Sequence, residues 1–185
     1  SLDGGETMDL AFRSRFPNQP IKDDVLKQLV ESYDGEIAWL DHEVGKLLRD
    51  IPPNTVVVIF SDHGEAFKEH GWMLHGATLY EEEIHCALVM RPPSPPPPPP
   101  VIDEPVMLLD VAPTLLGLCG ITPPINFEGA DLTSLLEGKK LSQRALFSEN
   151  RAVMEGRIEK MAMLYPWKLC YSLFDGSVEL YKLPD

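Results

Sequence analysis

Apolar residues recur along this chain with two kinds of spacing. From residue 23 or 24 to about residue 49 they return every three or four positions, which predicts a long helix whose apolar face packs against a sheet. Residues 55–60 form an unbroken apolar run rich in β-branched side chains, and Pro52 and Pro53 separate this run from the helix. Such a run is typical of a strand buried on both faces in a parallel sheet, so this region predicts an αβ unit.

Later segments predict shorter elements. We expect helices at residues 78–83, 110–118 and 130–136, and strands at residues 84–90 and 145–148. Beyond residue 150, short apolar segments predict strands at residues 153–155, 159–164, 167–172 and 177–183. Asp175 and Gly176 supply a hairpin signal between the last two strands. Residues 1–20 are rich in Gly, Asn, Pro and charge, and they predict a surface loop.

The order of these elements predicts an α/β fold in two parts. Residues 1–150 are expected to form a mostly parallel sheet with flanking helices, and residues 151–185 a small antiparallel sheet. Residues 92–100 end in six consecutive prolines, which form either a polyproline II rod or a loop. A stiff surface connector is favoured over a ligand for a proline-recognising module.

Candidate functional residues lie at the end of the apolar strand. Asp62 and His63 follow it directly, and Gly64 permits a sharp turn there. Ligands of open α/β sheets bind beyond the carboxyl ends of the strands, and carboxylate and imidazole groups are natural ligands of a divalent metal. The alternative is an ordinary turn that ends a strand, because Asp and Gly both favour turns.

A series of short motifs resembles the sulfatase family, within the alkaline-phosphatase-like superfamily of metal-dependent sulfate and phosphate ester hydrolases. Residues 61–65 read Ser-Asp-His-Gly-Glu, residues 75–76 read His-Gly, and residues 79–82 read Leu-Tyr-Glu-Glu. Further similar segments occur in the family's order at residues 33–41, 91–92, 108–116, 128–132 and 179–183. The resemblance therefore runs from about residue 30 to the end of the chain.

The resemblance implies roles for three residues. Asp62 and His63 match metal ligands of the family, and His75 matches a Lys or His that touches a non-bridging oxygen of the sulfuryl or phosphoryl group. The expected ion is calcium, which carboxylates bind well, or manganese or zinc, which imidazole binds well. His70 is expected to be a loop residue or to lie behind the metal ligands.

The chain departs from the family in its nucleophile. The family uses a formylglycine made from a Cys/Ser-x-Pro-x-Arg motif, or a Ser or Thr in the phosphate-ester branches, and no such motif is present here. We expect the three cysteines to be buried or half-buried: Cys86, Cys119 and Cys170. We expect the charged side chains of Arg157 and Lys168 to be exposed on their strands. The family's N-terminal pair of metal-binding aspartates also has no match. We therefore expect the second half of a catalytic domain, inactive without its N-terminal half.

The composition of the chain limits the kinds of partner that it could bind. The chain has 185 residues, 44% of them hydrophobic, enough for one core of ordinary size. Its formal charge of −13 argues against nucleic acid as a partner, and no segment predicts a membrane span. Three cysteines argue against a disulfide framework. Only the family resemblance suggests a secreted, periplasmic or lysosomal protein.

Three functions are consistent with the sequence. The first is a metal-dependent sulfuric ester hydrolase acting on a small-molecule or glycan sulfate ester. The second is a phosphate-ester hydrolase or phosphoethanolamine transferase of the same superfamily. The third is a non-catalytic scaffold fragment that recruits partners through its proline tract.

Overall fold

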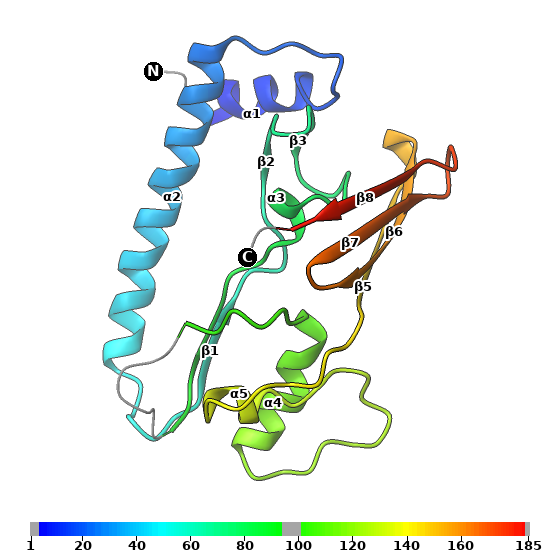
Figure 1. The fold of residues 1–185 in the computed structure, drawn as a ribbon. Helices are drawn as coiled ribbons and strands as arrows, with labels where there is room; N and C mark the ends of the chain where they lie inside the picture. The colour runs from blue at the N-terminus through cyan, green and yellow to red at the C-terminus, as the bar shows by residue number, and fades with distance from the viewer. Residues whose placement is uncertain (1–3, 94–100, 184–185) are drawn as a thin grey trace. The chain divides into compact units, whose positions relative to one another are not determined.

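The computed structural model describes residues 4–93 and 101–183, so most of the proline tract lies outside the described residues (Figure 1). The chain divides into two compact units. The first contains residues up to Ile51, His63–Cys86 and Asn150–Ile158, and the second contains Pro52–Asp62, Ala87–Glu149 and the residues from Glu159 onward. The expected boundary at residue 150 stays a prediction. No helix of the described residues is long and apolar enough to cross a membrane.

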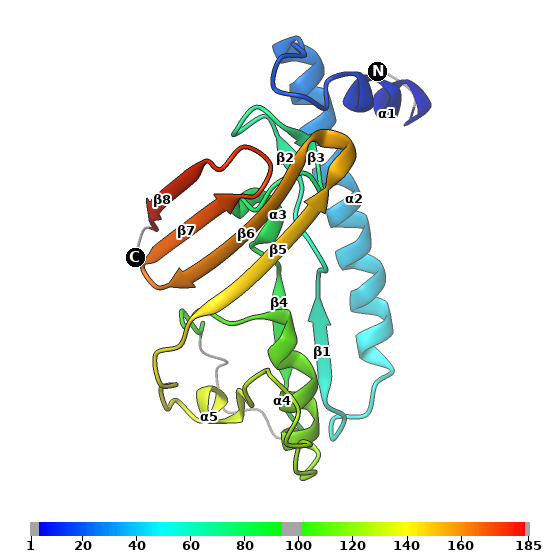
Figure 2. The ribbon, with the colours of Figure 1, turned by 90° about the vertical axis from the view of Figure 1, so that its right-hand side faces the viewer.

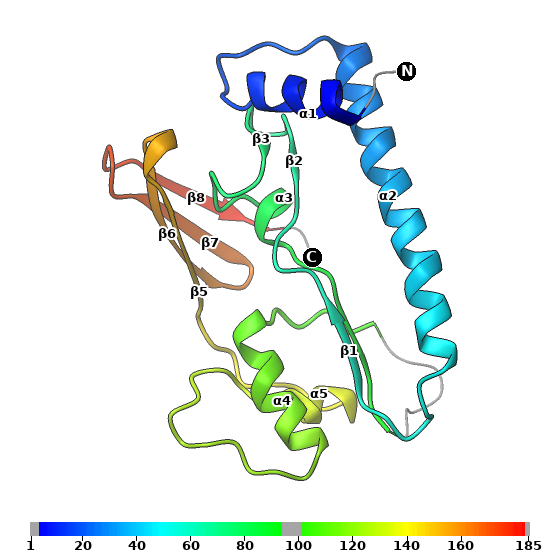
Figure 3. The same cartoon turned by 180° about the vertical axis from the view of Figure 1, so that it is seen from behind.

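The first unit is mainly helical. Its elements are α1 (Gly4–Arg13), α2 (Asp23–Arg49), β2 (Ala66–Phe67), β3 (Met73–Leu74), α3 (Glu81–Ile84) and the 3-10 helix η2 (Val153–Glu155). Helix α1 crosses α2 near the N-terminal end of α2, and the antiparallel pair β2 and β3 lies beside α1 (Figures 1 and 3). The core forms where these elements meet, around Ala11, Leu29 and Met73.

Two expectations for this unit are wrong, and one of its elements was not predicted. Residues 4–13 form a helix instead of a loop, because Ala11 buries its face against Leu29 and Met73. Residues 153–155 form a 3-10 helix instead of a strand, and Gly156 ends it with a positive φ of 69°. The β2–β3 hairpin was not predicted, since its strands have two residues each.

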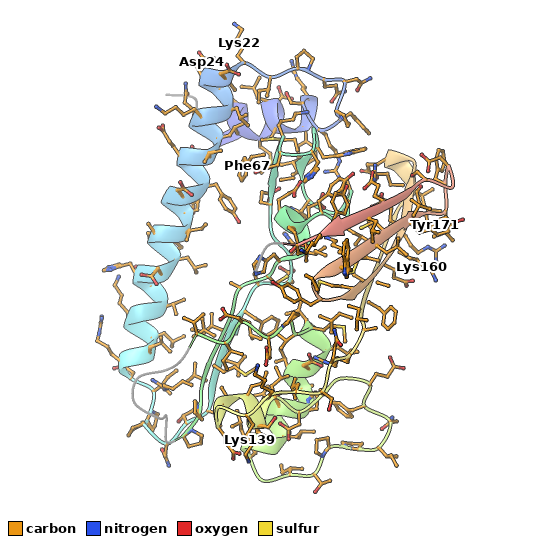
Figure 4. The ribbon with its side chains drawn as sticks, viewed as in Figure 1. Lys22, Asp24, Phe67, Lys139, Lys160 and Tyr171 are labelled. Atoms are coloured by element: carbon orange, nitrogen blue, oxygen red, sulfur yellow. The ribbon has the colours of Figure 1, made fainter. Side chains whose placement is uncertain are left out.

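Helix α2 has the predicted bounds but not the predicted burial. Leu29 is its buried residue, and the ring of Tyr33 packs edge-on against that of Phe67, with 5.2 Å between centroids. Figure 4 labels Phe67, which lies on β2. Further along, Ile37, Leu40 and Leu47 are 49–64% exposed. The expectation that this apolar face is core is therefore wrong beyond the first turns of the helix in this structure. Among the described residues of this unit, β2 and β3 lie beside the N-terminal part of α2 (Figure 3), where Phe67 and Leu74 pack against the cluster around Leu29.

The second unit combines strands with short helices. Its elements are β1 (Val57–Phe60), β4 (Leu88–Arg91), the 3-10 helix η1 (Leu108–Asp110), α4 (Val111–Leu118), α5 (Thr133–Leu136), β7 (Trp167–Ser172) and β8 (Val178–Lys182). Strands β5 (Leu146–Ala152) and β6 (Arg157–Leu164) lie mostly in this unit. The C-terminal sheet has the order β5-β6-β7-β8 and is antiparallel from β6 to β8, which confirms the predicted C-terminal sheet (Figure 2).

The mostly parallel sheet is not seen among the described strands. Strand β1 pairs with β4 alone in that part of the chain, and the pairing is antiparallel. Ile59 and Phe60 are 38% and 49% exposed, so the expectation of a strand buried on both faces is wrong for β1. A strand in a two-stranded ribbon has one paired edge and little cover on its faces.

Asp110 organises the segment around α4. Its carboxylate is fully buried, forms a two-pronged ion pair with Arg144, and accepts hydrogen bonds from the backbone N–H groups of Met107 and Ala130. The hydroxyl of Thr114 donates to the Asp110 carbonyl and accepts from the N–H of Leu132. One carboxylate thus joins α4 to the loop before α5 and to the strand that follows.

Two predicted exposures in the second unit are wrong. Lys168 is 2% exposed, because the alternation of β7 turns it to the same buried face as Cys170. Cys119 is exposed, since it caps the C-terminal end of α4, whereas Cys86 is half-buried and Cys170 buried as predicted. On the opposite face of the sheet, Lys160 and Tyr171 are cross-strand neighbours (Figure 4).

Candidate active site

The predicted metal ligands lie shortly after β1, with Ser61 between the strand and Asp62. Asp62 and His63 are both exposed, and the N–H of Gly64 donates to the carbonyl of Glu83 at 2.7 Å. His63 Nδ1 lies 2.7 Å from the Gly64 carbonyl oxygen. Because a carbonyl can only accept, Nδ1 is the donor in this contact, and Nε2 of the neutral ring is the nitrogen that a cation would bind.

The loop after β3 brings a second histidine to the first. His75 is exposed and lies between two residues with positive φ, Leu74 at 68° and Gly76 at 81°. Its ring stacks on that of His63, with centroids 3.7 Å apart and an interplanar angle of 24°. Two of the three candidate side chains, His63 and His75, therefore lie in contact within the first unit.

Three residues not singled out from the sequence support this loop. Glu65 Oε2 is 3.1 Å from His75 Nδ1, while Glu65 Oε1 is buried without a hydrogen-bond partner. Arg15 donates to the His75 carbonyl oxygen at 3.2 Å and to Glu155 at 3.1 Å. Glu65 could have been found, because it ends the Ser-Asp-His-Gly-Glu motif. Arg15 and Glu155 carry no local signal, since Arg15 lies 60 positions from His75 and 140 positions from Glu155 in the sequence.

His70 belongs to a separate cluster. Its Nδ1 lies 2.7 Å from Glu82 Oε1, and its ring stacks on Tyr80 with 3.9 Å between centroids. The guanidinium of Arg157 lies 6.0 Å from the Tyr80 ring and 5.3 Å from the Trp72 ring. Arg157 is thus half-buried against aromatic side chains instead of being an exposed strand charge.

The residues fit a divalent cation in chemistry but form an incomplete set. A carboxylate and an imidazole with its Nε2 lone pair are suitable donors. Within residues 4–93 and 101–183, no group of three or more His, Cys, Asp or Glu side chains is placed to hold a metal ion. Asp62 and His63 could therefore supply only part of a coordination shell.

Comparison with known proteins gives the family. The sequence model of the sulfatase family matches residues 7–121, more than half of the chain. This chain belongs to the sulfatase family. It is 30% identical over 127 residues to an arylsulfatase of Clostridium perfringens, covering 64% of this chain and 26% of that protein. It is also 30% identical over 118 residues to an N-acetylglucosamine-6-O-sulfatase of Bacteroides thetaiotaomicron, covering 61% and 21%.

Solved structures agree in fold. A putative sulfatase from Bacteroides thetaiotaomicron superposes with a TM-score of 0.75 at 22% identity, covering 94% of this chain and 41% of that one. A phosphonate monoester hydrolase of Agrobacterium radiobacter gives a TM-score of 0.73 at 23% identity, covering 89% and 37%. The sulfatase chain thus has the alkaline-phosphatase-like fold, and it spans about a quarter of the length of the curated relatives it matches.

Proposed function

We propose that this sulfatase-family chain is part of a metal-dependent sulfuric ester hydrolase. The observation that carries the proposal is the contact between the rings of His63 and His75, one shortly after β1 and the other on the loop after β3. This contact joins two loops that the family resemblance assigns to one site, and the curated relatives named above are sulfatases.

Each residue has a role in this proposal. Asp62 and His63 would hold a divalent cation, calcium or else manganese or zinc, and a bound cation would neutralise negative charge on the sulfate oxygens. His75 would present Nε2 to a non-bridging sulfuryl oxygen, because Glu65 engages its Nδ1. The ring contact with His63 would keep this nitrogen close to the cation site.

The nucleophile would come from a part of the protein outside this chain. No Cys/Ser-x-Pro-x-Arg motif occurs in the 185 residues, and the chain covers only 26% of the Clostridium relative. The same missing part would supply further metal ligands and the neighbouring strands of a mostly parallel sheet. The chain alone is then expected to be inactive, because transfer requires a nucleophile held against the sulfur atom.

The proposed substrate is a small-molecule or glycan sulfate ester. One relative is an N-acetylglucosamine-6-O-sulfatase, and one neighbouring structure is described as a complex with its substrate D-glucosamine-2-N,6-O-disulfate. A sulfated sugar is therefore the first substrate class to test. A secreted, periplasmic or lysosomal location would suit such a substrate.

A phosphate- or phosphonate-ester hydrolase is the second candidate, favoured by the likeness to the phosphonate monoester hydrolase. The deciding experiment compares kcat/KM of the full-length protein for aryl sulfate, aryl phosphate and aryl phosphonate, with and without a chelator. We expect sulfate to be preferred, and chelation and Asp62→Ala each to abolish turnover. Preference for the phosphate or phosphonate ester would support the second candidate. No turnover of any of the three esters would support the third function, a non-catalytic scaffold.

A further inference from the structure

The buried carboxylate of Glu83 accepts hydrogen bonds from the loop that carries His75. The residue is 3% exposed and lies in α3. Its two oxygens accept from the N–H of Ala77 at 3.1 Å and from the N–H of Thr78 at 3.1 and 3.3 Å. Glu83 also accepts from the Thr78 hydroxyl. A buried carboxylate with several donors of this kind is held firmly, because losing them would leave its charge unsatisfied.

The backbone of the same helix holds the other histidine loop. The carbonyl of Glu83 accepts from the N–H of Gly64 at 2.7 Å, directly after His63. A Cβ atom added to Gly64 would lie 2.1 Å from the Glu82 carbonyl oxygen, so this turn packs tightly against α3. One residue therefore binds the turn after His63 through its backbone and the turn after His75 through its side chain.

The His75 loop needs such an anchor. Leu74 and Gly76 both have positive φ, and Leu74 is a residue that rarely adopts this conformation. Residues 75–80 lie outside the regular helices and strands, so repeated backbone hydrogen bonds do not fix their path. The three donors that Glu83 binds begin only two residues after His75.

We propose that Glu83 is a positioning residue for His75. It fixes the 76–78 turn so that the His75 ring stays stacked on His63 and meets the substrate oxygen. The inference rests on the proposed function, because it acts through His75. Glu83 itself touches neither substrate nor metal.

The test is a double-mutant cycle in the full-length protein, with aryl sulfate as substrate. We expect Glu83→Ala to lower kcat/KM by about 10- to 100-fold in the wild-type background, as small misplacements of a catalytic group do. We expect the same change to have less than about a twofold effect when His75 is already Ala, because residues that act as a unit are not additive. An equal loss in both backgrounds, or no loss in the wild-type background, would overturn the proposal.

A general loss of stability is tested by a matched variant. Thr114→Val removes a buried hydroxyl that makes two hydrogen bonds in the other unit, and it should lower Tm without the kinetic pattern above. If Thr114→Val lowers kcat/KM as much as Glu83→Ala at equal loss of Tm, the effect is not positioning. His75→Ala alone tests the proposed function separately, since full activity in that variant removes the role of His75.

A second measurement does not depend on turnover. Hydrogen–deuterium exchange of the peptide covering residues 74–80 is expected to be faster in Glu83→Ala, and faster by less in Thr78→Ala, which removes only the hydroxyl donor. Thr78→Ala also serves if Glu83→Ala does not fold. Unchanged exchange in a folded Glu83→Ala protein would contradict the anchoring role of Glu83. If Glu83→Ala does not fold, unchanged exchange in Thr78→Ala would contradict it.

Discussion

At the scale of single residues, charged side chains hold the irregular backbone of this sulfatase-family chain. Lys68 Nζ donates to the carbonyl oxygens of Phe16, Gln19 and Gly71 at 2.8, 3.2 and 2.9 Å, joining the loop after α1 to the β2–β3 hairpin. Burial lowers the pKa of Lys68. Asp110 has the same role around α4. Such residues follow from three-dimensional proximity, so no local sequence pattern predicts them.

Lys68→Met is expected to destabilise the protein by about 1–3 kcal/mol, because three carbonyl groups lose a charged donor. Urea unfolding measures the change. Lys27→Met is the matched control, since Lys27 is exposed on α2 and its ion pair with Glu31 lies at the surface. Equal losses in the two variants would show that the three hydrogen bonds of Lys68 contribute nothing particular.

Asp110→Asn is expected to cost about 3–5 kcal/mol near pH 7, since it leaves Arg144 without its charged partner. Burial alone would raise the pKa of Asp110, but hydrogen bonds from Arg144, Met107 and Ala130 outweigh it and lower the pKa below its ordinary value of 3.8. The stabilisation is therefore complete above pH 3.8 and is lost as the pH falls through the lower folded pKa.

Urea unfolding of the wild type and of Asp110→Asn between pH 7 and pH 2 checks this dependence. The difference in unfolding free energy is expected to stay constant down to about the ordinary pKa and then to shrink. A difference that grows on acidification would contradict a lowered pKa of Asp110.

At the scale of elements, regular apolar spacing predicted the bounds of some helices and strands. It did not predict very short strands or a helix whose apolar positions are interrupted by glycines and charges. Helix α2 and strand β7 have the bounds that their apolar spacing predicts. Helix α1 was not predicted, because its glycines and charged residues interrupt the apolar spacing of its buried face. The β2–β3 hairpin was not predicted, because strands of two residues are too short to show a period. Motifs made Asp62, His63 and His75 candidates, and their roles stay predictions. Glu83 was found only from its buried contacts in the structure.

Two glycines allow an element-scale test. Gly64→Ala is expected to lower Tm and to disturb the turn after His63, because its Cβ would meet the Glu82 backbone at 2.1 Å. Gly35→Ala is expected to raise stability by about 0.5–1 kcal/mol, since Gly35 lies in α2 with nothing within 4 Å of the added Cβ. Thermal unfolding compares them. A Gly64→Ala protein as stable as the wild type would contradict the tight packing against α3.

At the scale of the whole molecule, a chain with a formal charge of −13 belongs to a family of enzymes that act on anions. Bound cations and nearby imidazoles can reverse the sign of the potential inside a site, so the two facts are compatible. In the proposed function, Asp62 and His63 would supply two donors, and the remaining ligands would come from the rest of the protein. The proposed function therefore depends on a cation that this chain would bind only in part.

The most direct measurement is the metal content of the purified full-length protein. The wild type is expected to hold a divalent ion after gel filtration, and Asp62→Ala and His63→Ala are each expected to lose most of it. Asp103→Ala, which changes an exposed carboxylate away from the motif, should retain it. A wild-type protein without metal, or Asp62 and His63 variants that hold as much metal as the wild type, would contradict the central claim.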